Sequence, residues 1–327
     1  MQSTQPPFAP AMPMRRLGRT DLTVSALALG TVELGLDYGI AVPGDFGKPD
    51  EQDAVRLVHA ALDAGINLID TARAYGASEE VLGRALAGRR DQVVLTTKVS
   101  TQGPGGAPLN PDDLAQAMQH SLDTSLRTLA TDYIDIWQVH NVDEATLAHA
   151  EVVADLFARN RAAGNIRFGG GSFYGAELPR RALTHNLFDV MQITYSILDQ
   201  RLADHFFVEA QAADIGILAR SVLLKGALTP RAEHLPDHLS SLRLRYRALT
   251  ALIGAAGLTA ATAQVAIAFA LAQPAIHAVL IGVRTVDELR QNLDALTVVL
   301  PPKLIAQLNI LRLDDANLLN PATWGIP

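Results

Sequence analysis

Four residues whose side chains could share a proton-transfer reaction follow separate apolar segments of the sequence. Asp70, Lys98 and His140 each end such a segment, and Tyr75 comes five residues after Asp70. Taken singly, each has an ordinary structural interpretation, since an aspartate can accept backbone donors and a histidine is more often hydrogen-bonded structure than a catalyst. Their occurrence at the ends of three successive segments favours one shared site.

The chemistry of these side chains is that of a general acid for a carbonyl oxygen. A buried lysine cation beside a tyrosine favours the phenolate, which predicts a pKa of Tyr75 below the usual value of about 10. Asp70 would keep the Lys98 ammonium charged and in place, and His140 would hold the substrate oxygen or relay a proton. Such an acid is typically worth about 10²–10⁴-fold in rate. Because it supplies no electrons, a bound hydride donor is its natural partner.

Composition excludes several other chemistries. The 327 residues include no cysteine, which rules out disulfides, thiolate nucleophiles and cysteine metal sites. With 27 basic and 34 acidic residues the formal net charge is −7, and no stripe of Lys and Arg appears, so we expect neither a nucleic-acid nor a membrane partner. The composition favours a globular protein of the cytoplasm that acts on a small molecule, and it leaves the oligomeric state open.

The elements that must position these residues alternate between short apolar strands and helices. We expect strands at 25–30, 67–70, 92–98, 133–140, 166–172, 190–194, 215–220 and 276–281, each followed by a helix. Uninterrupted apolar strands are typical of a parallel sheet buried on both faces. Eight such units predict an α/β fold, a single (β/α)8 TIM barrel, at whose C-terminal strand ends the four residues would meet.

The N-terminal part of the chain and one uncharged stretch are interpreted separately. A β-hairpin is expected at 15–24, so 1–14 would be a mobile N-terminal extension and 15–327 one barrel domain. The stretch 248–283 has no charged residue, but Gly254, Gly257 and Pro274 interrupt it. It therefore predicts a buried helix, a turn and a buried strand rather than a membrane span.

A doubly wound dinucleotide fold is not indicated. The glycines after Leu29 do not have the spacing of a dinucleotide fingerprint, and the run Gly169-Gly170-Gly171 lies mid-chain, where a tight turn is the simpler interpretation.

The segment NLIDTARAYG at 67–76, with Thr97-Lys98 and Gln138-Val139-His140, resembles the aldo-keto reductases, which are (β/α)8 barrels that use NAD(P)(H) without a Rossmann fold. The resemblance runs from Arg15 nearly to the end of the chain. It implies a hydride transfer between nicotinamide and an aldehyde or ketone, or a sugar or alcohol in reverse. In this reaction Tyr75 is the general acid/base, and the catalytic residues are Asp70, Tyr75, Lys98 and His140.

The same resemblance implies a set of cofactor-binding residues. They are Ser172, Gln192, Arg220, Ser221, Leu223, Gly226, Arg231, Gly282, Arg284, Glu288 and Asn292. Ser172 and Gln192 would hold the carboxamide, although Phe173 stands where relatives carry Asn. Arg220 would stack on the nicotinamide, the next residues would line the pyrophosphate, and Arg231 would close over it.

The preference between the two nicotinamide cofactors depends on the end of the last strand. Arg284 favours a 2′-phosphate, whereas Glu288, which replaces Gln or Arg of relatives, would repel it and accept from a ribose hydroxyl. The two side chains could also simply pair at (i, i+4). Family habit favours NADP(H) over NAD(H), and both remain open.

Aromatic residues are the candidates for the substrate pocket. They are Tyr38, Phe46, Trp137, Phe173 and Trp324. Barrel packing would also explain Trp137, and pinning of the tail would explain Trp324.

Two other functions are compatible with parts of the sequence. A cofactor-binding regulatory or sensor subunit is allowed by the resemblance to potassium-channel β subunits; slow cofactor oxidation and a stable partner complex would distinguish it. A metal-dependent barrel hydrolase needs more strand-end ligands than His140 and Asp70, so no metal is expected.

Overall fold

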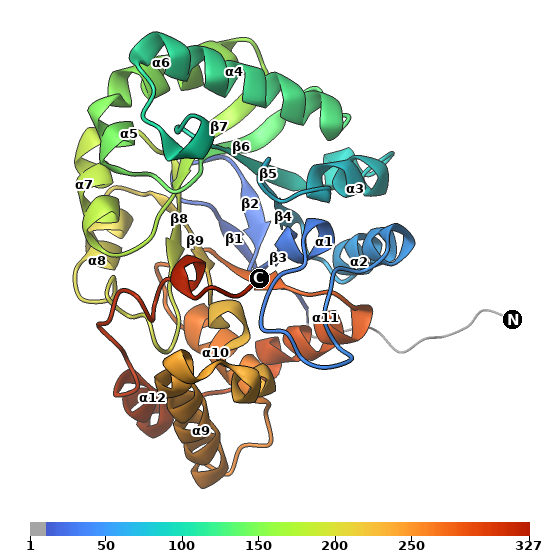
Figure 1. Ribbon diagram of the computed structural model, residues 1–327, viewed down its shortest axis with the longest axis vertical. Coiled ribbons are helices and arrows are strands. Elements are labelled where there is room, and N and C mark those ends of the chain that lie inside the picture. The colour runs from blue at the N-terminus through green and yellow to red at the C-terminus, as the bar shows by residue number, and fades with distance from the viewer. Residues whose placement is uncertain (1–10) are drawn as a thin grey trace, which may run out of the picture.

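A closed parallel barrel forms the centre of the computed structural model, which describes residues 11–327 (Figure 1). Its strands are β3 (Leu27–Gly30), β4 (Leu68–Asp70), β5 (Val94–Val99), β6 (Ile134–Val139), β7 (Ile166–Ser172), β8 (Val190–Thr194), β9 (Gly216–Arg220) and β10 (Ala278–Gly282). Every neighbouring pair is parallel, and β10 pairs with β3 to close the barrel. The predicted (β/α)8 barrel is confirmed.

Helices surround the barrel and return the chain from one strand to the next. The α-helices are α1 (Val32–Gly35), α2 (Glu51–Asp63), α3 (Ser78–Ala85), α4 (Pro111–Thr128), α5 (Glu144–Ala148), α6 (Ala150–Ala162), α7 (Glu177–His185), α8 (Phe206–Ala212), α9 (Ser240–Ala255), α10 (Thr262–Leu271), α11 (Val286–Leu293) and α12 (Pro302–Asn309). Short 3₁₀ helices are η1 (Arg90–Gln92), η2 (Pro104–Gly106), η3 (Leu224–Gly226), η4 (Pro230–His234), η5 (Asp237–Leu239), η6 (Asp294–Thr297) and η7 (Pro321–Thr323). The uncharged stretch becomes the second half of α9, the buried α10 and β10. Among residues 11–327, no helix is both long and apolar enough to span a bilayer.

The predicted hairpin closes the N-terminal end of the barrel. Strands β1 (Met14–Arg16) and β2 (Thr23–Ser25) pair antiparallel, and buried Leu17, Leu22 and Val24 pack with apolar residues of the barrel strands. Residues 1–10 of the expected N-terminal extension, 1–14, lie outside the described part of the chain. Its last residue, Met14, already belongs to β1.

Alternation along each strand decides which side chains enter the barrel. Leu68, Val94 and Ile136 belong to an inner apolar cluster, whereas the next residue of each strand packs in the outer cluster beneath the helices. With a period of two, side chains two or four places further along also point inward. This periodicity brings Asp70 and Lys98 to the C-terminal mouth from neighbouring strands.

Candidate active site

A cavity of about 590 Å³ opens at the C-terminal ends of the barrel strands. At one end its wall includes Asp70, Tyr75 and His140, and at the other end it reaches Arg231 and Arg284. The cavity is therefore long enough to connect the predicted proton-transfer residues with the predicted cofactor-binding residues. Lys98 does not line it, since this side chain is buried behind Asp70 and Tyr75.

The buried ammonium of Lys98 joins the polar groups at the base of the cavity. Its Nζ donates to both oxygens of Asp70 at 2.7 and 2.6 Å and to the carbonyl oxygen of Thr71 at 2.8 Å. The Oη of Tyr75 lies 3.4 Å from the same nitrogen. The ammonium and carboxylate form an ion pair shielded from water, so removal of either partner would leave a buried charge.

The loop after β4 fixes the place of Tyr75. The Thr31 side chain and backbone N–H both donate to the carbonyl oxygen of Asp70. Gly35, at the end of α1, packs so closely that a Cβ there would overlap the carbonyl oxygen of Tyr75. A glycine is therefore required where α1 meets the Tyr75 backbone.

Burial controls the protonation of these groups. It raises the pKa of Tyr75 above 10.0, and the negative charge of Asp70 raises it further while Arg220 opposes the change. Burial also lowers the pKa of Lys98, against the attraction of Asp70. The pKa of Tyr75 is thus raised, contrary to the prediction that it is lowered, because desolvation of the phenolate outweighs the positive charge of Arg220.

His140 stands beside Tyr75 as a neutral imidazole. The two rings meet edge to face with centroids 5.8 Å apart. Burial, together with the positive charges of Lys98 and Arg220, lowers the pKa of His140 to about 3. At neutral pH this ring can therefore donate or accept one hydrogen bond without carrying charge.

Two buried amides complete the surroundings of Asp70. Gln192 Nε2 donates to Asp70 Oδ1 at 2.7 Å, and Gln138 Nε2 lies 3.5 Å from the same oxygen. The Oε1 atoms of both amides are buried and have no hydrogen-bond partner among residues 11–327. Because Gln192 lines the cavity, its unpaired oxygen suits a carboxamide N–H donor of a bound cofactor.

Arg220 is held against protein groups at the mouth. Its guanidinium lies 3.8 Å from the ring centroid of Tyr174 and donates to the carbonyl oxygen of Phe173 at 2.9 Å. The Nε of Arg220 is buried without a partner among the described residues. Arg220 lines the cavity and stacks on Tyr174.

The segment after β9 has an unusual backbone. Ser221, Leu224 and Lys225 all have positive φ, between 46° and 59°, although none is glycine. Strain of this kind is concentrated at ligand clamps and active sites. With Leu223 and Gly226, these residues form one wall of the cavity.

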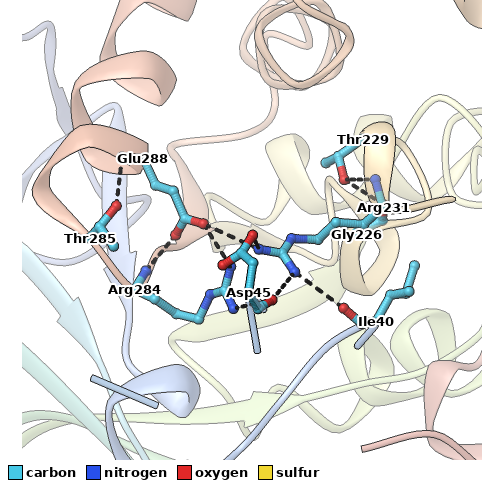
Figure 2. Close-up of polar contacts among 8 residues, drawn as sticks. All are labelled: Ile40, Asp45, Gly226, Thr229, Arg231, Arg284, Thr285 and Glu288. Atoms are coloured by element: carbon cyan, nitrogen blue, oxygen red, sulfur yellow. Dashed lines mark hydrogen bonds and ion pairs between the residues drawn. The ribbon is translucent and has the colours of Figure 1, made fainter. Parts of the chain in front are cut away.

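The far end of the cavity carries a cluster of opposite charges (Figure 2). Arg284 donates to both oxygens of Glu288, from its backbone N–H at 2.7 Å and its guanidinium at 2.9 Å. The same guanidinium lies 3.2 Å from Asp45, which also pairs with Arg231 at 2.5 Å. The (i, i+4) pair that the sequence allowed is thus formed, and Asn292 and Gly282 line the adjoining wall.

Most of the predicted substrate-pocket aromatics do not reach the cavity. Trp137 is one residue out of phase with the inward side chains of β6 and packs edge to face on Phe157 under the helices. Phe173 is fully buried against Phe188. Trp324 is buried and donates to the carbonyl oxygen of Asn317, so it pins the tail.

The predictions that Trp137, Phe173 and Trp324 line the substrate pocket are therefore corrected. Phe46 is 39% exposed and lines a separate hollow. Tyr38 does line the cavity, beside Lys225.

Sequence reasoning missed Glu33, which lines the cavity just after the first barrel strand. Its Oε2 is buried with no hydrogen-bond partner among residues 11–327. Burial raises the pKa of Glu33 to about 7, and Glu288 adds to the rise. Gly282 leaves the space, since a Cβ there would overlap the Glu33 carboxylate. The sequence signal that could have identified Glu33 is an acidic residue shortly after the first barrel strand.

Comparison with known proteins gives consistent results. The sequence model of the Aldo/keto reductase family matches residues 26–312. The uncharacterized oxidoreductase YrpG of Bacillus subtilis is 30% identical over 322 residues, covering 90% of this chain and 94% of that protein. The 6-dehydroglucose reductase of Novosphingobium aromaticivorans is 33% identical over 239 residues, 69% of each chain. The holo form of aldo-keto reductase AKR11C1 from Bacillus halodurans superimposes with a TM-score of 0.76 at 26% identity, covering 92% of this chain and 96% of that one.

Proposed function

The chain belongs to the aldo/keto reductase family and is an NAD(P)(H)-dependent oxidoreductase of small carbonyl compounds; from this premise we propose that Asp70, Tyr75, Lys98 and His140 carry out its proton transfer. The observation that supports the proposal best is the buried Lys98 ammonium, bonded to both Asp70 oxygens and 3.4 Å from Tyr75 Oη. We further propose that residues 15–327 act as one barrel domain.

Tyr75 is the proton donor to the carbonyl oxygen in this proposal. Because burial raises its pKa, the phenol keeps its proton until negative charge develops on the substrate oxygen, which is then the stronger base. The nearby Lys98 cation reduces the cost of the phenolate that remains. A nicotinamide cofactor supplies the hydride for the carbonyl carbon when bound.

His140 orients the substrate oxygen in this proposal. Its ring lies at the cavity wall beside Tyr75 and is neutral at physiological pH. A neutral imidazole N–H can bond to the carbonyl oxygen without competing to protonate it, which leaves proton transfer to Tyr75. Asp70 acts on Lys98 rather than on the substrate.

The remaining predicted residues would hold the cofactor. Ser172 and Gln192 would bind the carboxamide, supported by the unpaired buried Oε1 of Gln192. Arg220 and the strained segment 221–226 would flank the nicotinamide and pyrophosphate. We propose NADP(H) as the preferred cofactor because Arg231 and Arg284 supply two guanidinium groups at the far end of the cavity.

A polar carbonyl compound is the substrate class that this cavity favours. Three of the five predicted aromatics are buried elsewhere, while His140, Arg220 and the rings of Tyr38 and Tyr174 line the mouth. A related protein is named as a 6-dehydroglucose reductase. We therefore propose hydroxylated aldehydes or ketones of sugar-like character.

A direct test combines cofactor binding with turnover. NADPH and NADH are titrated by fluorescence, and cofactor oxidation is then followed with a panel of sugar-like, aliphatic and aromatic carbonyls. We expect tighter NADPH binding and fastest oxidation with hydroxylated substrates. Tighter NADH binding would contradict the cofactor assignment. Bound cofactor that no carbonyl oxidises, together with a stable protein complex, would favour a regulatory subunit instead.

A further inference from the structure

Asp45 joins two arginines that come from distant parts of the chain. Its Oδ2 lies 2.5 Å from Arg231 and its Oδ1 3.2 Å from Arg284. The carbonyl oxygen of Asp45 accepts further bonds from both guanidinium groups, at 3.0 and 3.4 Å. Figure 2 shows the aspartate between them. One acidic residue therefore satisfies donors that two planar guanidinium groups direct to the same place, an arrangement that suits a phosphate equally well.

The backbone around Asp45 holds its carboxylate at this place. The N–H of Asp45 donates to the carbonyl oxygen of Val42 at 3.0 Å, which closes a tight turn. Asp45 and Arg284 line both the main cavity and a second hollow of about 420 Å³. The ion pairs of Asp45 with Arg231 and Arg284 thus lie between the main cavity and the second hollow.

The two carboxylates of the cluster differ in how firmly they are held. Glu288 uses both oxygens on Arg284, and its backbone N–H is capped by Thr285. The Asp45 side chain is 65% exposed, whereas those of Arg231 and Arg284 are only 20% and 11% exposed. Exposed ion pairs contribute little, so Asp45 is the partner that an incoming anion can replace.

We propose that Asp45 is a cofactor-selectivity residue, whose carboxylate occupies the place of the 2′-phosphate on Arg231 and Arg284 and so weakens NADP(H) binding relative to NAD(H). The inference rests on the proposed function, which places these arginines at the 2′-phosphate. A ribose hydroxyl carries no charge and does not compete for the two guanidinium groups, so NAD(H) binds without displacing Asp45.

The test uses Asp45→Asn, which keeps the side-chain shape and removes its charge. Asp53→Asn is the control, because Asp53 lines the second hollow but pairs with Arg56 instead. Dissociation constants are measured for NADPH and NADH, and for 2′,5′-ADP and 5′-AMP, which differ by the 2′-phosphate alone. A thermal melt confirms that each variant is folded.

We expect Asp45→Asn to bind NADPH and 2′,5′-ADP about 3- to 10-fold more tightly, because the incoming phosphate no longer has to displace a carboxylate from the two guanidinium groups. NADH and 5′-AMP should change less than about 2-fold, and the gain should shrink in high salt. Equal changes for both ligands of a pair, a similar gain in Asp53→Asn, or weaker NADPH binding would overturn the inference. If the unaltered protein bound neither cofactor, the proposed function itself would be wrong.

Discussion

Glu33 is a carboxylic acid whose pKa the fold raises to about 7, so that it is mostly protonated below neutral pH, and Glu33→Gln tests this directly. Its Oε2 is enclosed without a hydrogen-bond partner among the described residues. Burial raises its pKa from 4.5 to about 7. Glutamine preserves the shape of the side chain and carries no charge at any pH.

The pKa of Glu33 is higher in the folded protein than in the unfolded chain. Between the two values the folded protein binds more protons, so the free energy of unfolding falls as pH rises through this interval. Each unit by which the pKa differs between the folded and unfolded states is worth about 1.36 kcal/mol. The free energy of unfolding of the unaltered protein should therefore fall by about 2 to 3 kcal/mol relative to that of Glu33→Gln between pH 5 and pH 8. Most of the loss occurs between pH 5 and pH 7.

The assay is urea unfolding of both proteins at pH 5, 6, 7 and 8. The difference between them at each pH removes the contributions of all other titrating groups, His140 included. Glu80→Gln serves as a control because Glu80 is exposed, and its difference from the unaltered protein should stay flat. A Glu33→Gln difference that is also flat across this range would refute the argument that burial raises the pKa of Glu33.

Three other predictions concern how the site is held together. Asp70→Asn leaves the Lys98 ammonium buried without its counter-charge and should lower the free energy of unfolding by about 3–5 kcal/mol, whereas the double variant with Lys98→Met should recover most of it; urea unfolding that shows no recovery would contradict the buried pair. Because the pKa of His140 is lowered to about 3, His140→Gln should leave the shape of the pH–rate profile unchanged between pH 5 and pH 8, and a step near pH 6.5 that disappears in this variant would show a charged imidazole. Gly35→Ala forces a Cβ against the Tyr75 backbone, so it should cost about 1–3 kcal/mol of stability and more than 10-fold in kcat; activity equal to that of the unaltered protein would show that α1 does not position Tyr75.

The barrel and the convergence of Asp70, Tyr75, Lys98 and His140 could be predicted because both follow from local pattern. Apolar strands of three to seven residues repeat eight times, and the position of Asp70 and Lys98 at or near strand ends fixes where they meet. The period of two within β6 turns Trp137 away from the cavity and onto Phe157, so its nearness to His140 in the sequence does not make it a pocket residue. Gln138, its neighbour, points inward instead, toward Asp70.

The remaining features depend on packing that no local pattern encodes. Asp45 reaches Arg231 and Arg284 through a loop whose path depends on contacts across the barrel mouth. The direction of the Tyr75 pKa is likewise a balance between desolvation and nearby charges. The sequence predicts that Tyr75 lies near Asp70 and Lys98, but it does not predict how strongly burial desolvates these groups.

The central claim is that Tyr75 delivers the proton, and single-turnover hydride transfer in Tyr75→Phe tests it most directly. Pre-bound NADPH is mixed with a carbonyl substrate and its oxidation is followed by absorbance, while Tyr38→Phe serves as the control because Tyr38 lines the same cavity. We predict that Tyr75→Phe binds NADPH normally and slows transfer about 10²–10⁴-fold, and that Tyr38→Phe stays within 10-fold of the unaltered protein. A Tyr75→Phe rate within 10-fold of the unaltered protein, with cofactor bound, would contradict the claim.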